Sequence, residues 1–391
     1  MRIPTLLYPL AILFAALAGP ASVAAGQVQR SAVHDYSIDT FVSGLERPWA
    51  LEFLPSGDVL VTEKGGALRM VRNGTLLAEP VSGLPEVYTE GQAGLLDVAL
   101  HPKFADNALV YLAYSKPLGE GQSTTAIIRG RLEGMALQDV EEVFEAQSRG
   151  RGHYGSRLVF DDAGYLFATI GDRQASPSGV LEEHPAQALD NHHGVIVRLK
   201  DDGGIPGDNP FVSEPGALPE IWSYGHRNPQ GMAFDPASRR LWATEHGPQG
   251  GDELNLITAG ANYGWPVIGY GVQYGQGQAI HATTTREGME QPVYFWVPSI
   301  GAAGLALYNG APFRNWQGAL LVGGLANEQI TLLHMNDTRV RRVETLPIRM
   351  GRIRDVVVGP DGLVYLATDE GDGEGAILRL EPVPRTGLGD R

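Results

Sequence analysis

The chain contains 391 residues, carries a formal net charge of −15 and has no cysteine. Its acidity argues against a nucleic-acid partner, because an acidic surface repels phosphates, although acidity is also common in proteins that are simply soluble. The absence of cysteine excludes disulfides and thiolate chemistry, so a large core or a bound metal must stabilise the fold.

The first 25 residues are typical of an export signal. Arg2 supplies a positive start, Leu6 to Leu17 form an apolar run, and Ser22 to Ala25 provide a small-residue cleavage site. The apolar run is short for a membrane span, and Pro20 favours cleavage over a retained anchor. We therefore expect residues 1–25 to be a signal peptide, no stable membrane insertion, and a periplasmic or secreted protein.

From residue 26 onward, one pattern recurs: a turn rich in Pro, Asp, Asn or Gly, then a short run of mostly apolar residues. Its six strand copies are Val59–Thr62, Leu109–Leu112, Tyr165–Thr169, Leu241–Thr244, Leu320–Val322 and Val364–Thr368. A spacing of about 45 to 80 residues fits one four-stranded blade and a variable loop. The pattern predicts an all-β fold, in which residues 26–391 form a single six-bladed β-propeller of four-stranded antiparallel blades. Two β-sandwiches would also contain short strands, but they do not explain six copies.

In a propeller, the loops at one end of the innermost strands converge on a common mouth, so residues far apart in sequence can form one site. Gln92–Leu96 is the first candidate segment, and His153–Arg157 directly precedes the third strand copy. A histidine at such a loop-to-strand edge can act as a general base, because its ordinary pKa lies near neutrality. A lone histidine is more often structural, so both interpretations stay open at this point.

The segment from Tyr224 to Tyr263 places cationic, amide and carboxylate groups between glycines that permit close approach of a ligand. Its loop carbonyls and the carboxylates of Asp252 and Glu253 suit calcium, which takes six to eight oxygen ligands. The alternative is a plain turn followed by a solvated acidic pair. Arg227 and Asn228, taken alone, are equally compatible with a surface ion pair and a turn residue.

Arg352 and Arg354 are expected on the same side of an extended strand, because side chains alternate with a period of two. Two guanidiniums on one side favour an anionic ligand, and a polycarboxylate would match their forked donors. The alternative is that Asp355 and other acids pair with them.

These segments, in this order, resemble the soluble quinoprotein sugar dehydrogenases of the glucose/sorbosone dehydrogenase family. The resemblance covers roughly residues 45 to 380 and is carried by Gly91–Leu96, His153–Arg157, Gly225–Gly231, Glu245–Glu253, Asn262–Pro266 and Arg352–Asp355. It implies a six-bladed propeller that binds pyrroloquinoline quinone (PQQ) and calcium and oxidises aldose sugars at C1 to lactones. The sequence around His153 resembles that of the aldose sugar dehydrogenase branch more closely.

The resemblance also implies roles for individual residues. His153 would remove the proton from the sugar C1 hydroxyl while hydride passes to the quinone, and Arg227 would polarise the quinone carbonyl. Cofactor or sugar binding would fall to Gln92, Asn228, Tyr274, Arg352 and Arg354. The carbonyls of Gly247 and Pro248 would bind a catalytic calcium ion, and Glu253 with the carbonyl of Tyr263 would bind a structural one.

Two departures from the glucose-oxidising branch stand out. That branch carries a lysine in the loop where this chain has Leu325-Ala326-Asn327, and an acidic residue where this chain has Gly152. These differences argue against glucose specificity and for a wider range of aldoses. A lost buried carboxylate contact would weaken cofactor binding by about 1–3 kcal/mol if nothing replaces it.

Two other classes of function remain as alternatives. A calcium-dependent propeller lactonase would use the metal to polarise a carbonyl and His153 to activate water, without quinone or paired arginines. A propeller that only binds carbohydrate would have lost the cofactor together with the lysine. The preferred sugar, the electron acceptor and the choice between monomer and homodimer do not follow from the sequence.

Overall fold

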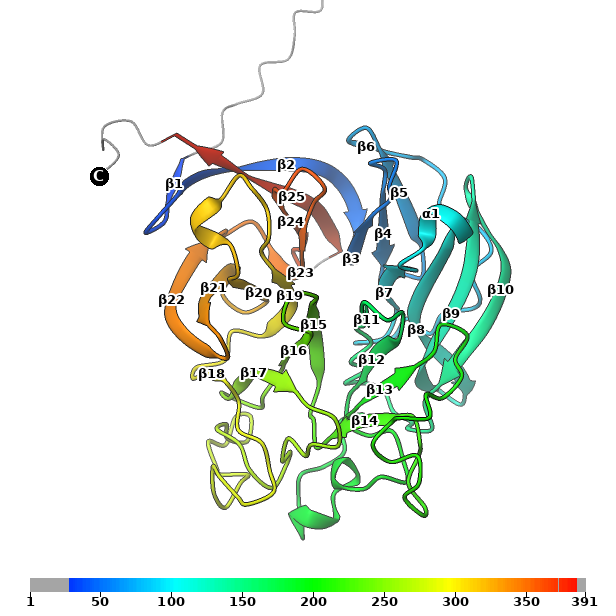
Figure 1. Cartoon of the computed structure of the whole chain (residues 1–391), viewed down its shortest axis with the longest axis vertical. Helices are drawn as coiled ribbons and strands as arrows, with labels where there is room; N and C mark the ends of the chain where they lie inside the picture. Colours follow the sequence, from blue (N-terminus) through cyan, green and yellow to red (C-terminus); the bar gives the residue numbers. More distant parts are fainter. Residues whose placement is uncertain (1–27, 372, 385–391) are drawn as a thin grey trace, which may run out of the picture.

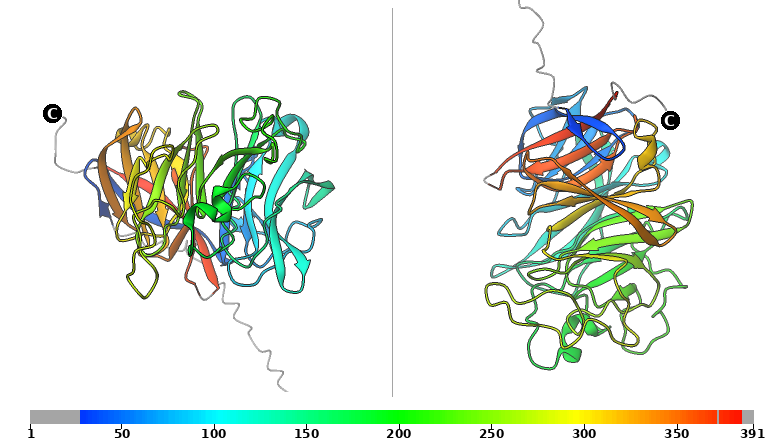
Figure 2. Two further views of the ribbon diagram at one scale, coloured as in Figure 1. Left: turned by 90° about the horizontal axis from the view of Figure 1, so that it is seen from below. Right: turned by 90° about the vertical axis from the view of Figure 1, so that its left-hand side faces the viewer.

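A computed structural model describes residues 28–371 and 373–384, so the expected signal peptide lies outside the described residues. Six antiparallel sheets stand around a central axis (Figure 1). The views in Figure 2 show that the ring is thinner than it is wide. The predicted six-bladed, all-β propeller is confirmed. In the described part of the chain, no helix is long and apolar enough to cross a membrane.

Each blade has the same order of strands from the axis outward. The innermost strands are β3 (Pro48–Phe53), β7 (Leu95–Leu100), β11 (Leu158–Phe160), β15 (Pro229–Asp235), β19 (Ala302–Leu307) and β23 (Arg352–Val358). The second strands are β4 (Val59–Glu63), β8 (Leu109–Gly119), β12 (Leu166–Ile170), β16 (Arg240–Glu245), β20 (Leu320–Gly324) and β24 (Val364–Asp369). The third strands are β5 (Leu68–Arg72), β9 (Gln122–Glu133), β13 (Val195–Leu199), β17 (Asp252–Ile257), β21 (Gln329–Asn336) and β25 (Glu374–Val383).

The outer strands complete the blades: β6 (Thr75–Leu76), β10 (Ala136–Glu145), β14 (Ile221–Tyr224), β18 (Tyr294–Trp296), β22 (Arg339–Pro347) and β2 (Asp35–Glu46). A short strand, β1 (Gln29–Arg30), adds a fifth member outside β2. Helical structure in the described residues is limited to α1 (Phe104–Asn107) and three single turns, Leu181–Glu183, Pro185–Gln187 and Arg314–Trp316.

The sixth blade joins the two ends of the described chain. Strand β2 pairs with β25 along its length, from Asp35 opposite Val383 to Glu46 opposite Glu374. The other three strands of this four-stranded unit, β23 to β25, come from the end of the sequence. The ring is therefore closed by backbone hydrogen bonds between segments more than 300 residues apart.

The six sequence copies correspond to the second strand of every blade, β4, β8, β12, β16, β20 and β24. Their side chains pack on both faces of the sheet, and six apolar clusters each join two neighbouring blades. In β12, for example, Leu166 and Ala168 face the second blade while Phe167 faces the fourth. Strands buried on both faces need continuous apolar runs, so the second strand of each blade is the one that the sequence pattern identifies.

A buried charge cluster lies on the axis. The Arg157 guanidinium contacts Asp97 Oδ1 at 2.8 Å and Asp355 Oδ1 at 3.1 Å, and lies 4.5 Å from the ring centre of Trp49. Asp97 also accepts a hydrogen bond from the Leu158 backbone N–H at 2.6 Å. Burial raises the pKa of Asp97 to about 7, with Arg157 opposing the shift. The cluster links the inner strands of the first, second, third and sixth blades.

Arg157→Leu is expected to lower the free energy of unfolding by about 3–5 kcal/mol, because it leaves two buried carboxylates without their cation. Denaturant unfolding measures the change. The loss should be smaller at pH 5 than at pH 8, since protonation removes the uncompensated charge. Arg131→Leu is the matched control, because Arg131 pairs with Glu133 and Asp139 at the surface, where ion pairs contribute little. Equal losses for the two variants would contradict the cluster's role.

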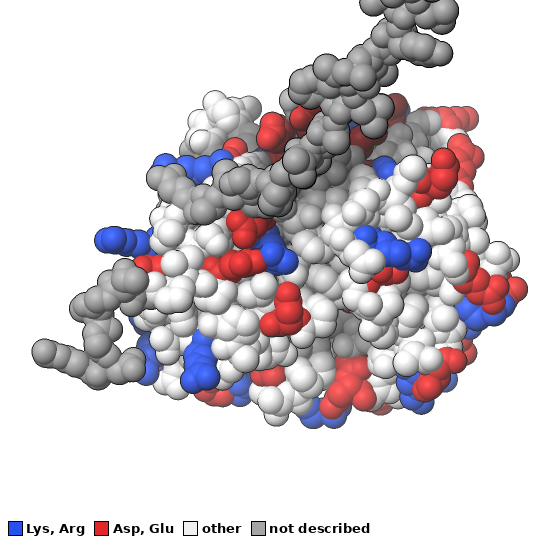
Figure 3. All heavy atoms as spheres, turned by 90° about the horizontal axis from the view of Figure 1, so that it is seen from above, with Lys and Arg blue, Asp and Glu red and all other residues white. Residues whose placement is uncertain are grey.

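Charges of both signs are interspersed on one face of the molecule (Figure 3). On the face seen in Figure 3, acidic and basic side chains lie side by side among the described residues. The acidic side chains are thus mixed with basic ones on this face.

Candidate active site

A cavity of about 550 Å³ opens at one end of the axis. Its wall comes from two kinds of segment: residues that precede an innermost strand, such as Gln92 and His153, and residues that follow a second strand, such as Lys64 and Asp172. The predicted catalytic and cofactor-binding residues all lie on this wall: Gln92, His153, Arg227, Asn228, Tyr274, Arg352 and Arg354. The fold therefore brings together residues that the sequence separates by up to 262 positions.

His153 is held by Asp172, a residue that the sequence did not single out. Its Nδ1 lies 2.5 Å from Asp172 Oδ1, and Asp172 Oδ2 accepts a 2.7 Å hydrogen bond from Trp265 Nε1. This arrangement places the proton on Nδ1 and leaves Nε2 as the free ring nitrogen. Burial lowers the pKa of His153 below its ordinary value, although the bond to Asp172 opposes the shift. The imidazole is therefore neutral at pH 7, as a general base requires.

The carboxylate of Asp172 is kept ionised by its neighbours. Burial alone would raise the pKa of Asp172, but the hydrogen bond from His153 and the charge of Arg227 hold it below its ordinary value. A buried carboxylate that stays charged beside an imidazole stabilises the protonated ring after proton transfer.

The backbone around His153 is constrained. His153 has a φ of 44°, in the left-handed region that side chains seldom adopt. Gln92 Oε1 accepts the His153 backbone N–H at 2.8 Å, and Asn228 Oδ1 accepts that of Gly155 at 3.1 Å. Unusual backbone conformations of this kind persist only where surrounding contacts enforce them, and they cluster at functional sites. Gln92 and Asn228 thus position the His153 loop.

Arg227 is buried, so the surface ion-pair interpretation is wrong. Its Nη1 donates to the carbonyls of His246 at 3.0 Å and Gly247 at 2.7 Å. Its guanidinium lies 5.2 Å from the ring centre of Trp265, and its backbone N–H donates to Glu245 Oε2 at 2.7 Å. These contacts fix a permanent cation in the cavity wall, on the side where His153 and Asp172 also lie.

A cationic wall lies across the cavity. Arg352 and Arg354 both face it from β23, which confirms their placement on one side of a strand. The acid that pairs with them is Asp369, at 3.5 Å from Arg352 Nη1 and 2.9 Å from Arg354 Nε. The suggested pairing with Asp355 is wrong, because Asp355 points to the axis and contacts Arg157. Lys64 adds a further cation to this wall.

The residues predicted for the two calcium sites lie around one space. Gly247, Pro248, Glu253 and Tyr263 line a second, small space of about 20 Å³ next to Arg227. A space of about 10–15 Å³ is enough for one water-sized particle. The described residues contain no group of three or more His, Asp or Glu side chains suited to a metal, so a cation here would rely on backbone carbonyls. Calcium, which accepts mixed carbonyl and carboxylate oxygens, fits such a donor set.

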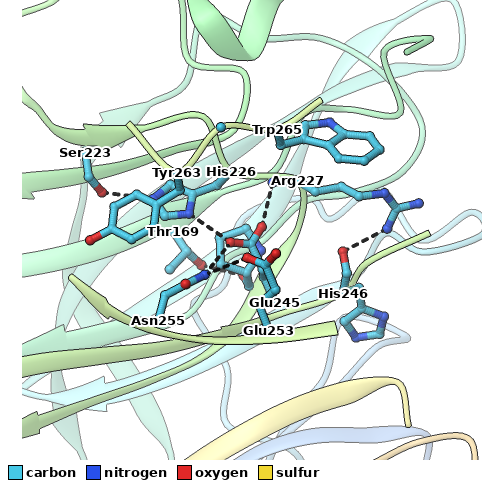
Figure 4. A network of polar contacts seen from close by, with 12 residues as sticks. Thr169, Ser223, His226, Arg227, Glu245, His246, Glu253, Asn255, Tyr263 and Trp265 are labelled. Carbon is cyan, nitrogen blue, oxygen red and sulfur yellow. Dashed lines mark hydrogen bonds and ion pairs between the residues drawn. The ribbon is translucent and has the colours of Figure 1, made fainter. Parts of the chain in front are cut away.

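Figure 4 shows the polar network beside this space. Asn255 Nδ2 donates to Glu245 Oε1 at 2.9 Å and to Glu253 Oε2 at 3.1 Å, while its buried Oδ1 has no hydrogen-bond partner in the described part of the chain. Burial and the neighbouring Glu245 raise the pKa of Glu253 well above its ordinary value. A bound cation would relieve both the repulsion between the carboxylates and the unpaired oxygen.

The solvated acidic pair considered for Asp252 and Glu253 is wrong for Asp252. Asp252 is 1% exposed, and its carboxylate accepts the backbone N–H groups of Gly247 at 2.9 Å and Ala302 at 2.8 Å. It therefore braces the loop whose carbonyls are the predicted calcium ligands.

Glu253→Gln is expected to change the melting temperature in opposite directions with and without calcium. With a chelator, the variant should melt at or above the wild-type temperature, because a costly buried carboxylate is gone. With saturating calcium it should melt lower, because a ligand that binds only the folded state stabilises by about 2.7 kcal/mol at a hundred times its Kd. Thermal unfolding measures both, with the exposed Glu79→Gln as control. If the wild-type melting temperature does not change when calcium is added, the predicted calcium site is wrong.

The two departures from the glucose-oxidising branch both fall at the cavity. A side chain at Gly152 would overlap that of Gln174, whose Cδ lies 2.3 Å from the Cβ position. Gln174 itself lines the cavity, so its amide fills the space beside Gly152. Leu325, in the second segment that departs from that branch, lines the cavity wall.

The sequence interpretation missed Asp172 and Lys64. Both lie just beyond a second strand, at the same strand end as Glu245: Lys64 is the first residue after β4, and Asp172 is the second residue after β12. No repeated pattern singled them out, because the fifth blade has the apolar Leu325 directly after its second strand.

Comparisons with known proteins identify the family of the chain. The family described as Glucose / Sorbosone dehydrogenase matches residues 45–379. Aldose sugar dehydrogenase YliI of Escherichia coli K12 is 42% identical over 353 residues, which cover 88% of this chain and 93% of the relative. The crystal structure of the apo form of the soluble E. coli aldose sugar dehydrogenase superposes with a TM-score of 0.83 at 41% identity, covering 89% of this chain and all of that one. The PQQ-bound aldose sugar dehydrogenase of Streptomyces coelicolor superposes with a TM-score of 0.71 at 27% identity, covering 88% and 98%.

Proposed function

Since the chain belongs to the glucose/sorbosone dehydrogenase family, we propose that it oxidises aldose sugars at C1 to lactones, with PQQ and calcium as cofactors. The observation that carries this proposal is the shared cavity, in which a neutral His153 paired with Asp172 faces Arg227 and a wall of cations. The PQQ-bound structure of the Streptomyces relative supports the choice of cofactor.

The residues of this chain divide the work as follows. The free Nε2 of His153 takes the proton of the C1 hydroxyl, and Asp172 stabilises the imidazolium that forms. The C–H electron pair leaves as hydride and the C–O bond becomes the lactone carbonyl. PQQ, when bound, supplies the two-electron acceptor. Arg227 provides a fixed positive charge near the position where negative charge develops, and such preorganised charge is a large catalytic contribution.

The direct test is reconstitution of the purified protein with PQQ and calcium, followed by dye-linked assays across a panel of aldoses. Turnover that requires added PQQ is the expected result, and no turnover with any aldose would overturn the proposal. Addition of PQQ should also produce a visible absorption band that sugar bleaches. A calcium-dependent lactonase would show neither the band nor the bleaching. Such an enzyme would also have no need for the cationic wall of Lys64, Arg352 and Arg354.

The signal-like residues 1–25 support action in the periplasm or outside the cell, with electrons passed to an acceptor still to be identified. Fractionation of cells that express the full chain would test this location.

Arg227→Ala is expected to lower kcat by about a hundredfold or more, as does loss of one donor to a developing negative charge elsewhere. KM for the sugar should change less, because the guanidinium acts where charge develops during the reaction. Arg227→Lys should restore part of the rate, and the exposed Arg149→Ala is the control. If kcat falls by less than about fivefold, Arg227 does not have this role.

A further inference from the structure

Lys64 is the buried cation of the cavity that neither the repeat nor the family resemblance assigned. It follows β4 directly, on the first blade, and is 7% exposed. Its Nζ donates to the Gly91 carbonyl at 3.1 Å, and no carboxylate lies within ion-pair distance of it among residues 28–371 and 373–384. An ammonium has three protons to donate, so two remain for a ligand in the cavity that Lys64 lines.

The surroundings of Lys64 are cationic. The charged groups that act on it are Arg354, Arg47 and Arg352, with Asp369 as the one opposing carboxylate. Asp369 is already engaged by Arg352 and Arg354. Burial, and then the repulsion from Arg354 and Arg47, lower the pKa of Lys64 to about 8. A buried lysine among arginines costs free energy in the empty protein, and an anion placed between them would remove that cost.

The loop after β20 explains why a cation is needed here. It presents Leu325 to the cavity and continues with Ala326, in the segment where the resemblance to the glucose-oxidising branch implies a lysine. The wall therefore lacks a cation on the fifth blade and has an additional one on the first blade. Both positions border Arg352 and Arg354 of the sixth blade, because the ring places the first and fifth blades on either side of it.

We propose that Lys64 is a cofactor-binding residue, whose ammonium binds a carboxylate of PQQ together with Arg352 and Arg354 and so compensates for the missing lysine. This inference rests on the proposed function, because it takes PQQ as the anion. It goes beyond that function in assigning a carboxylate contact to the first blade.

The test measures PQQ affinity directly, by calorimetry at pH 7 with calcium present, so that it does not depend on turnover. Lys64→Met keeps the length of the side chain and removes its charge, and it should raise Kd about ten- to a hundredfold, as loss of a charged hydrogen bond does. Lys64→Arg should bind within a few-fold of wild type. Lys103→Met removes an exposed lysine and should leave Kd unchanged.

Each outcome separates the two proposals. If wild type binds PQQ and Lys64→Met binds within about twofold of it, the role of Lys64 is wrong while the proposed function stands. If wild type binds no PQQ, the proposed function itself fails, and this inference fails with it. Circular-dichroism melting of each variant establishes that a weaker Kd is measured on folded protein.

A second measurement needs only the wild-type protein. With a pKa of about 8, Lys64 is partly deprotonated at pH 8, and binding of a carboxylate should return the proton. Calorimetry in two buffers with different ionisation enthalpies counts the protons taken up. We expect uptake of a fraction of a proton at pH 8 and little at pH 6.5. No difference between the two pH values would overturn the assignment even if Lys64→Met did not fold.

Discussion

His153→Ala should reduce sugar turnover at least a hundredfold while leaving PQQ affinity nearly unchanged. The imidazole is the neutral base at the cavity, with Nδ1 held by Asp172 and Nε2 free, and general-base catalysis contributes about 10²- to 10⁴-fold. Dye-linked kcat and calorimetric Kd separate the two effects. The expected signature is therefore a large loss in kcat beside an intact binding isotherm.

The control for this variant is His334→Ala, which removes a histidine on β21 that contacts Arg342 away from the cavity. It should retain full activity. A His153→Ala rate above about a hundredth of wild type would exclude His153 as the base. Addition of imidazole to that variant should restore part of the rate, since a small base can occupy the vacated space.

Asp172→Asn is expected to lower kcat about a thousandfold or more, as the equivalent change does where a carboxylate orients a catalytic histidine. An amide offers one oxygen, whereas Asp172 accepts from both His153 Nδ1 and Trp265 Nε1. If the amide nitrogen faces His153, the ring proton must move to Nε2, which then cannot take a proton from the sugar. Both the tautomer and the orientation of the base are lost.

The pH dependence of kcat/KM distinguishes this role from a purely structural one. Because burial lowers the pKa of His153, the wild-type rate should fall only below pH 6.5, where the base becomes protonated. The bond to Asp172 raises the pKa against that trend, so the acid limb in Asp172→Asn should move to still lower pH. An unchanged acid limb would contradict the pairing, and melting curves show whether the variant is folded.

The sequence predicted the architecture through its second strands, because these are buried on both faces and read as continuous apolar runs. The inner and outer strands carry less signal. For example, β11 has three residues and β6 has two, so neither is recognisable alone. The pairing of β2 with β25 was also missed, since register between distant segments is set by the closure of the ring and leaves no local pattern.

Site residues could be predicted from the sequence where they belong to contiguous motifs, and less well where they are isolated. Motifs located His153, Arg227, Arg352 and Arg354 on one cavity. Their partners depended on packing in three dimensions: Asp369 of β24 pairs with the arginines, whereas Asp355 contacts Arg157 on the axis. Asp172 and Lys64 are single polar residues after apolar strands, a context that sequence alone does not distinguish from an ordinary loop.

The pairing of β2 with β25 also constrains how the protein can be made. Five blades are complete in the chain before β23 is synthesised, but the sixth cannot form until β25 has emerged and met β2. Until then, the apolar flanks of the first and fifth blades, including Leu51 and Val61 on one side and Leu321 and Leu332 on the other, have no neighbour to cover them. The growing polypeptide therefore passes through an open-ring stage that is prone to aggregation, and its last strand converts this stage into the native protein.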